Sequence, residues 1–123
     1  MRAAHFILYV QDQALSTRFY QKVLGRPPRL DVPGMSEFEL VDGAILGLMP
    51  EQGAQSLLQI ETRPATTRCE LYLVLSDLHG ALRRALEAGG TLLQPAESRD
   101  WGERVAYLRD PDGHVLALAE KLS

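Results

Sequence analysis

Two side chains with acid–base chemistry open the two apolar runs that are typical of β-strands. His5 starts the run His-Phe-Ile-Leu-Tyr-Val, and Glu70 starts Glu-Leu-Tyr-Leu-Val-Leu sixty-five residues later. Side chains alternate between the faces of a strand, so Glu70 shares a face with Tyr72. An imidazole and a carboxylate at matching strand positions could move a proton or anchor a polar ligand. The sequence therefore predicts His5 and Glu70 as an acid–base or anchoring pair.

The other reactive side chains lack the patterns that nucleophilic or redox chemistry needs. A single cysteine, Cys69, forms neither an internal disulfide nor a Cys-x-x-Cys motif. There is no Gly-x-Ser-x-Gly elbow and no glycine-rich phosphate loop. His79 and His114 have no partners at metal-ligand spacing, and we expect His114 to be exposed because it directly follows a turn glycine.

Composition sets the class of protein. The 123 residues are 46% hydrophobic and 24% charged, which fits one globular domain with a real core. The net charge of −3 and the absence of a dense Lys/Arg cluster argue against nucleic-acid binding. Apolar runs are too short to span a membrane, and the N-terminus lacks a signal-peptide pattern. We expect a cytoplasmic protein.

Turns and periodicity divide the chain into two similar halves. Asp110-Pro-Asp-Gly113 joins two β-type segments, because Pro presets φ and Gly supplies the positive φ that closes the turn. Asp42-Gly43 occupies the same place in the first half, and pairing across it puts Phe38, Gly47 and Met49 on one face. Each half reads strand, helix and three strands, with the first helix ending at Gly25.

These units define one domain with modules at 1–52 and 69–123. The linker between them, 53–68, has a weak pattern with a short strand at 57–61. A single module cannot bury both faces of its sheet, so two should pair around a concave surface, where ligands bind.

Three motifs make the chain resemble the vicinal oxygen chelate superfamily. They are Phe19-Tyr20-Gln-Lys-Val-Leu24-Gly25, Trp101-Gly102 followed by Arg104, and Asp110-Pro-Asp-Gly113. That group includes glyoxalase I, bleomycin-resistance proteins, fosfomycin-resistance transferases, methylmalonyl-CoA epimerases and extradiol dioxygenases. The resemblance covers nearly the whole chain. It implies an α+β fold in which two βαβββ modules form an open cup-shaped mixed sheet, usually within a homodimer and sometimes with modules exchanged between chains.

The resemblance also implies where a metal would bind. The family's ligands lie at the start of each module's first strand and four residues beyond each hairpin glycine, which here are His5, Gly47, Glu70 and Ala117. Only His5 and Glu70 carry donor atoms, whereas catalytic zinc normally has three protein ligands. We therefore expect no metal cofactor, with zinc, nickel, manganese or iron as the alternative.

The small residues at positions 47 and 117 would instead widen the floor of a ligand cup. Trp101 could form a lid or wall that stacks on a flat ligand, or could pack against the hairpin. Arg104 could meet an anionic group, or could form a surface salt bridge. The full set of candidate ligand-binding residues is His5, Phe38, Gly47, Met49, Glu70, Tyr72, Trp101, Arg104 and Ala117.

Three functions remain open. The first is a metal-free, homodimeric protein of the bleomycin-resistance type, whose cup binds and sequesters a small aromatic or amphipathic molecule. The second is a divalent-metal-dependent glyoxalase-like lyase, isomerase or dioxygenase that uses His5 and Glu70 with a further ligand. The third is a metal-free isomerase with Glu70 as its base.

Overall fold

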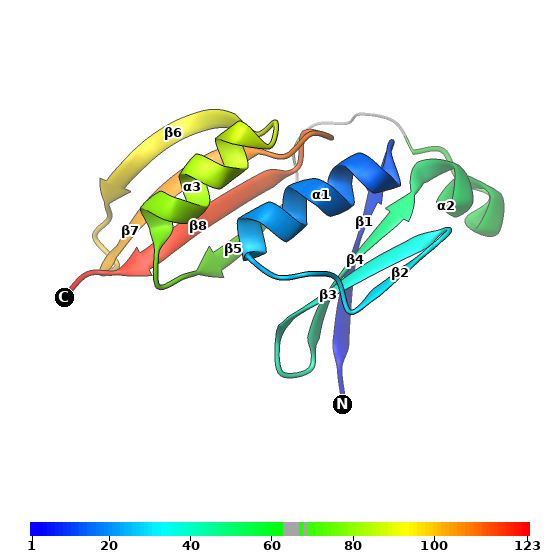
Figure 1. The fold of residues 1–123 in the computed structure, drawn as a ribbon, viewed down its shortest axis with the longest axis horizontal. Helices are drawn as coiled ribbons and strands as arrows, with labels where there is room; N and C mark the ends of the chain where they lie inside the picture. The colour runs from blue at the N-terminus through cyan, green and yellow to red at the C-terminus, as the bar shows by residue number, and fades with distance from the viewer. Residues whose placement is uncertain (63–66, 68) are drawn as a thin grey trace.

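A computed structural model describes residues 1–62, 67 and 69–123 (Figure 1). In chain order the elements are β1 (Ala4–Val10), α1 (Gln13–Leu24), β2 (Leu30–Val32), β3 (Met35–Val41), β4 (Ala44–Pro50), α2 (Glu51–Leu58), β5 (Glu70–Val74), α3 (Leu78–Glu87), β6 (Thr91–Ser98), β7 (Glu103–Arg109) and β8 (Val115–Lys121). The described strands form two sheets, sheet 1 (β1-β4-β3-β2) and sheet 2 (β5-β8-β7-β6). The predicted α+β fold is confirmed.

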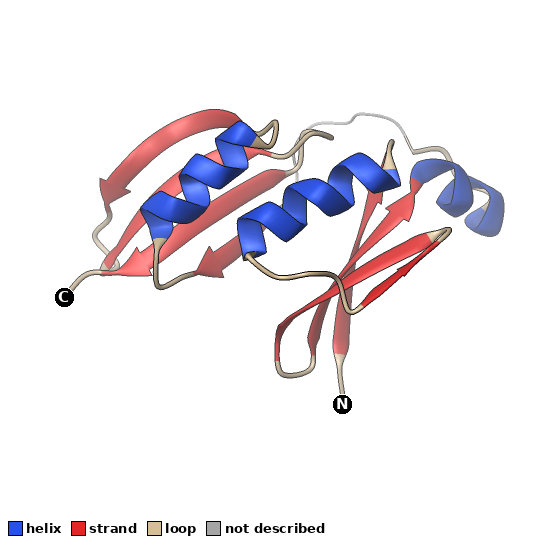
Figure 2. Ribbon diagram, viewed as in Figure 1, coloured by secondary structure: helices blue, strands red, loops and turns tan. Residues whose placement is uncertain are grey.

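Each module repeats the same strand pairing. The first strand of each sheet runs parallel to the last strand of its module, so β1 pairs with β4 and β5 with β8. The remaining pairs are antiparallel. The sheets do not close into a barrel (Figure 2). No helix in the described parts of the chain is long and apolar enough to cross a membrane.

Equivalent aspartates cap the two main helices. The Asp12 side chain accepts the N–H of Leu15 at the start of α1, and the Asp77 side chain accepts the N–H of Gly80 at the start of α3. These bonds satisfy backbone donors that a helix cannot pair internally. Gly25 ends α1 in the left-handed conformation, as the sequence predicts.

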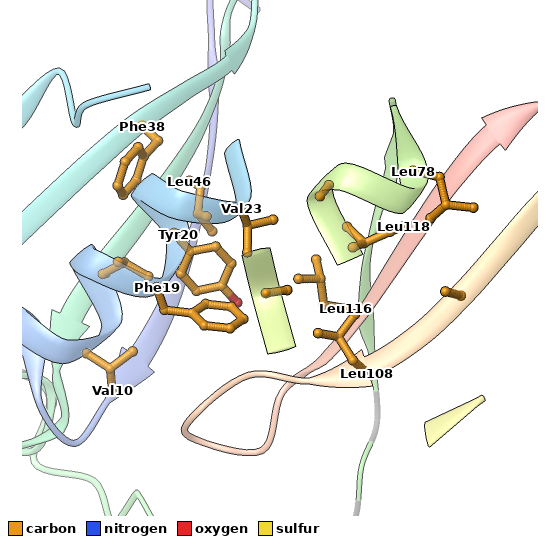
Figure 3. Packing of buried hydrophobic residues seen from close by; sticks show 14 residues of the cluster. Val10, Phe19, Tyr20, Val23, Phe38, Leu46, Leu78, Leu108, Leu116 and Leu118 are labelled. Atoms are coloured by element: carbon orange, nitrogen blue, oxygen red, sulfur yellow. The ribbon is translucent and has the colours of Figure 1, made fainter. Parts of the chain in front are cut away.

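The modules share one apolar core between α1 and α3, which lie side by side (Figures 1 and 2). Figure 3 shows Phe19 and Val23 of α1 directed toward Leu108 and Leu116 of sheet 2, all within one buried cluster. Each such side chain adds about 1.5–3 kcal/mol by leaving water. We call the sheet surfaces toward these helices the core faces and the opposite surfaces the outer faces.

The predicted linker contains a helix in place of the predicted strand. Residues 51–58 form α2, whose Ala54 is buried, and Gln59 ends it with a φ of 57°. Glu, Gln, Ala and Leu favour helix, and the apolar pair Leu57 and Leu58 gave a misleading strand signal. The predicted boundary at 52 therefore falls inside a helix. Residues 63–66 and 68 of the predicted linker lie outside the described residues.

A bulge makes the predicted facing of Phe38 wrong. The register of β3 against β4 shifts between Glu39 and Val41, so Phe38 pairs with Leu46 and Glu37 pairs with Gly47. Phe38 is fully buried in the shared core, on the face opposite to Gly47. It therefore belongs to the core and is not exposed to a ligand.

Candidate ligand-binding site

The outer face of sheet 1 carries three of the predicted site residues, His5, Gly47 and Met49. The partner of His5 is Glu37, whose Oε2 lies 3.6 Å from His5 Nδ1. Arg29 fixes this carboxylate by donating from Nε and Nη2 to Oε1 at 3.0 and 2.9 Å. Sequence reasoning missed Glu37 because the bulge reverses the facing of β3. His5 therefore contacts Glu37 within sheet 1, and among the described residues no hydrogen bond or salt bridge joins it to Glu70.

Neither small residue opens space for a ligand. A Cβ at Gly47 would lie 3.1 Å from Ile7 Cγ1 and 3.3 Å from Met35 Sδ, so these two side chains already cover that position. Ala117 is fully buried in a cluster that Tyr72 and Tyr107 pack against. The predicted wide floor is therefore absent, because neighbouring side chains fill it.

Trp101 and Tyr72 come together beside the outer face of sheet 2. The Trp101 indole donates from Nε1 to Tyr72 Oη at 3.0 Å, and Tyr72 donates its own O–H to Glu103. Burial and then this bond to the carboxylate raise the pKa of Tyr72. Trp101 keeps 54% of its surface exposed, so its ring is tethered but open on one side. The pair forms an aromatic surface rather than an enclosed cup.

Arg104 lies on the core face of sheet 2, away from that aromatic surface. It stands opposite Glu120 in the β7–β8 register, and it alternates with Val105, which belongs to the outer-face cluster. Glu120 in turn accepts the N–H of Leu78 at the start of α3, at 3.3 Å. The prediction that Arg104 shares a ligand site with Tyr72 and Trp101 is wrong.

A groove of about 830 Å³ opens between the two modules. Aliphatic side chains line it from both sides, among them Leu8 and Leu46 of sheet 1 and Leu71 and Leu73 of sheet 2. All residues of 69–75 border it, so the edge of β5 that has no neighbouring strand forms one wall. Of the predicted site residues, Glu70 and Tyr72 line this groove and the other seven do not.

The polar residues of the groove are few, and His114 is the best fixed of them. Its Nδ1 lies 2.8 Å from Asp110 Oδ2, and its backbone N–H donates to Asp110 Oδ1 at 2.9 Å. The expectation that His114 is exposed is wrong, because most of its side chain is covered. Two sequence features could have pointed to this role of His114. Asp110 and His114 stand at i and i+4 around a tight turn, and Tyr20 lies on a predicted helix.

Asp110 is the buried centre of a hydrogen-bonded cluster. It is 3% exposed and also accepts the Tyr20 hydroxyl at 2.7 Å and the N–H of Asp112 at 2.9 Å. Burial alone would raise its pKa, but the bonds from His114 and Tyr20 outweigh burial and lower it. The same carboxylate raises the pKa of His114. Burial and the charge of Asp110 hold the pKa of Tyr20 well above its usual range.

Asp112 fastens the same turn to the start of α1. Its Oδ1 accepts the N–H of Gln11 at 2.8 Å, and its Oδ2 accepts the Ser16 hydroxyl at 3.3 Å. These bonds and the one from Tyr20 connect residues about a hundred positions apart in the sequence. The turn therefore links the second module to the helix of the first.

Asp110, Asp112 and His114 have donor atoms within 4.8 Å of one another, which raises the question of a metal. Both Asp110 oxygens and both Asp112 oxygens already accept hydrogen bonds from protein groups. His114 Nδ1 must carry a proton to donate to the ionised Asp110, so it cannot also ligate through that atom. The positions that the family resemblance implies supply donors only at His5 and Glu70. The family positions thus supply two donors where a catalytic metal normally has three protein ligands, and the carboxylate oxygens of the turn cluster are already used in hydrogen bonds.

Comparison with known proteins assigns the chain to a family. A model of the Glyoxalase/Bleomycin resistance protein/Dioxygenase superfamily matches residues 2–118. An uncharacterised protein of Mycobacterium bovis is 30% identical over 122 residues, which cover 92% of this chain and 79% of the relative. A second uncharacterised protein, from Mycobacterium tuberculosis, is also 30% identical, over 92% of this chain and 71% of its own length.

Solved structures agree with this assignment. A glyoxalase-related enzyme from Fulvimarina pelagi superposes with a TM-score of 0.86 at 25% identity, over 97% of this chain and 87% of that one. A glyoxalase/bleomycin resistance protein/dioxygenase family enzyme from Burkholderia phytofirmans reaches 0.84 at 18% identity, over 96% and 97% of the two chains, and supports the fold alone. The chain belongs to the Glyoxalase/Bleomycin resistance protein/Dioxygenase superfamily, as its helix and turn motifs predict.

Proposed function

We propose that the protein binds a small aromatic or amphipathic molecule in the groove between its modules, without a metal, and thereby sequesters it. The observation that carries this proposal is the volume and lining of the groove, about 830 Å³ enclosed mainly by aliphatic side chains. Ligand sites are typically apolar clefts of about 300–1,000 Å³ with a few fixed polar groups. The groove fits that description.

The size of the groove limits the ligand. The wall formed by residues 69–75 is about 20 Å long, because a strand rises about 3.3 Å per residue. A fused-ring compound or a ten-carbon chain fits this length. Burying about 200 Å² of apolar ligand surface would contribute about 5 kcal/mol before the entropic cost of binding. Such a ligand is held by shape and apolar contact.

Catalysis has weaker support in this geometry. A metal-dependent lyase, isomerase or dioxygenase needs about three protein ligands, and His5 is already paired with Glu37. A metal-free isomerase would need Glu70 as a tuned base, but Glu70 is exposed at the start of β5. We therefore favour binding over turnover.

The test uses the neutral apolar dye Nile red and a matched pair of variants. Phe6 and Ile7 are neighbours on β1, are 57% and 43% exposed, and only Phe6 lines the groove. Phe6→Asp should weaken dye binding at least about tenfold, because a charge would face the buried ligand. Ile7→Asp should leave dye affinity unchanged. Equal effects of the two variants, or no saturable dye binding by the wild type, would contradict the proposal.

Cys69 supplies an independent readout of the same groove. It is the single cysteine of the sequence, and it is exposed where it lines the groove. Bound ligand should slow the reaction of its thiol with a maleimide in wild-type protein. In Phe6→Asp this protection should disappear at the same ligand concentration. If saturating ligand leaves the rate of Cys69 labelling unchanged, the ligand binds outside this groove.

We also propose that the protein is a homodimer in the cytoplasm. Two observations support this proposal. The family resemblance implies a homodimer, and large apolar side chains are exposed at and beyond α2. Leu57 is 72% exposed, Leu58 50% and Ile60 43%. Light scattering coupled to size-exclusion chromatography should give twice the 13.7 kDa chain mass.

A further inference from the structure

We propose that the ligand of the groove is a neutral, apolar, peptide-like compound that binds in an extended conformation as an added strand on β5. This inference rests on the proposed function, because it names the class of amphipathic molecule that the same groove selects. An N-acylated tripeptide amide with aliphatic side chains represents the class. The inference depends on which main-chain groups of β5 face the groove, on the charges of the groove and on its length.

The main chain of β5 borders the groove along its whole length. In sheet 2, β5 pairs with β8 on one side and with no described strand on the other (Figure 1). All residues of 69–75 line the groove, although side chains alternate between the two faces of a strand. Leu71 and Leu73 pack against the shared core, whereas Tyr72 packs on the outer face. Because residues of both faces line the groove, the unpaired edge of the strand lies in it.

The register of β5 shows which main-chain groups face the groove. Leu75 donates its N–H to the carbonyl of Ala119 on β8 at 2.7 Å, and Val74 is the register partner of Ala119. In a parallel pair, the bonds to the neighbouring strand come from alternate residues. Leu73 and Leu75 therefore bond to β8, and the N–H and C=O groups of Tyr72 and Val74 point away from β8, toward the groove.

Tyr72 and Val74 thus offer two donors and two acceptors to a ligand. Within the part of the chain that the structure describes, no strand pairs with β5 on this side. Main-chain groups beside an apolar wall are costly until they are paired. An extended peptide backbone supplies matching groups, as in recognition by strand addition. A ligand residue that lies between Tyr72 and Val74 donates its N–H to the Tyr72 carbonyl and accepts the Val74 N–H.

The charges of the groove favour a ligand without charged ends. The charged or titratable lining residues with their own partners or with water around them are Arg26, Glu70 and His114. Arg26 and Glu70 are exposed, and His114 is bonded to Asp110. No charged residue follows Glu70 on β5, where the lining is mainly aliphatic. A charged terminus in this part would leave water without a partner, so neutral caps fit better.

The length of the groove fits a short peptide. The wall formed by residues 69–75 is about 20 Å long. Three extended residues with two capping groups span about 15 Å, at about 3.3 Å per residue. Alternate side chains of such a ligand lie over the aliphatic lining beside Leu71 and Leu73. Apolar contact and main-chain hydrogen bonds therefore act on the same ligand.

The experiment compares acetyl-trileucine amide with its depsipeptide, in which ester oxygens replace the N–H groups of all three residues. Both compounds are neutral and carry the same side chains, and each displaces Nile red from the folded protein. We expect wild type to prefer the peptide about tenfold, as one or two hydrogen bonds provide. A groove without these bonds should prefer the ester, because an amide N–H is costlier to remove from water. Equal affinities, or a preference for the ester, would overturn the inference while groove binding stands. Failure of Nile red to bind at all would instead overturn the proposed function.

Hydrogen exchange measured by NMR locates the bonds on the protein without any variant. In the free protein the amides of Leu73 and Leu75 should exchange slowly and those of Tyr72 and Val74 quickly, because only the first two bond to β8. Saturating peptide should slow exchange at Tyr72 and Val74 by about tenfold or more. The inference fails if the peptide leaves these two amides unchanged, or if they are already as slow as Leu73 in the free protein.

Val74→Pro removes one N–H that faces the groove and leaves the bonds to β8 in place, since an edge strand tolerates proline where its N–H points away from the sheet. It should abolish most of the preference for the peptide. Val74→Ala is the matched control, because it shortens the same exposed side chain, keeps the N–H and should behave as wild type. The affinity for Nile red reports whether the groove is still folded. A full preference for the peptide in a folded Val74→Pro variant would contradict strand addition on β5.

Discussion

The hairpin turns of the two modules occupy equivalent places but have different surroundings. Gly43 and Gly113 both adopt positive φ, at 80° and 94°, so the backbones close in the same way. In the first turn Asp42 is exposed and Val41 keeps 70% of its surface in solvent. In the second turn Asp110 is buried and accepts bonds from a helix of the other module. A glycine at positive φ closes both hairpins, whereas only the second turn has a buried aspartate whose hydrogen bonds join the two modules.

The difference follows from where the helices lie. Tyr20, Ser16 and Gln11 lie on or just before α1, and each reaches the second turn. In the residues that the structure describes, no side chain at or near α3 makes the equivalent bond to Asp42. The internal repeat is therefore symmetric in backbone and asymmetric in the contacts between modules.

Asp110→Ala compared with Asp42→Ala tests this asymmetry most strongly. Removing the Asp110 carboxylate leaves the Tyr20 hydroxyl, the His114 ring and two backbone N–H groups without their acceptor. We expect it to lower the free energy of unfolding by about 3–5 kcal/mol, as the loss of one partner of a buried pair does. Asp42→Ala should change it by less than about 0.5 kcal/mol.

Urea unfolding, followed by circular dichroism, measures both variants of this pair. Asp110→Asn refines the result, because it keeps the shape and one acceptor oxygen but removes the charge, and its loss should be intermediate. Similar losses for Asp110→Ala and Asp42→Ala would mean that the second turn does not hold the modules together.

The sequence predicts most of the fold because the fold depends on local signals. Residue types at single positions were enough to predict these features. Asp12 caps α1, Gly25 ends it in the left-handed conformation, and glycines with positive φ close the turns. The two failures have different causes, one in strand pairing and one in a misleading local signal. The bulge near Glu39 reversed the facing of Phe38, and α2 replaced the strand expected at 57–61.

The site was harder to predict, because it depends on contacts across the sequence. Glu37 meets His5 only through the β3 register. Arg104 falls on the core face of sheet 2 because it alternates with Val105, which belongs to the outer-face cluster. The groove arises from how α1 and α3 set the two sheets apart, which no single segment encodes. Of the predicted residues, only Glu70 and Tyr72 line it, and the role of His114 required its distant partners to be seen.

Alanine at the two turn glycines should show that the backbones are equivalent even though the contacts are not. A residue with a Cβ at positive φ costs about 1–2 kcal/mol, so Gly43→Ala and Gly113→Ala should each lower the free energy of unfolding by that amount. A Cβ at Gly113 meets nothing within 4 Å, and one at Gly43 meets Arg2 O at 3.4 Å, so packing adds little. Urea midpoints measure the two losses, and a difference above about 1 kcal/mol would show that the turns differ in backbone as well.

The smallest effect should be a pH dependence confined to the second turn. The folded-state pKa of His114 lies above its ordinary 6.5, so its stabilising contribution is complete below about that pH and is lost as pH rises through the raised value. For Asp110 the folded pKa lies below its ordinary 3.8, so its contribution is present above that pH and is lost as pH falls through the lowered value.

Urea midpoints of wild type should therefore decline from near neutral pH upward. His114→Gln should flatten that decline, and Asp42→Ala should not alter it, since the first turn has no titrating partner in the described residues. A decline of the same slope in His114→Gln would assign the pH dependence to other groups and leave the second turn only its neutral hydrogen bonds.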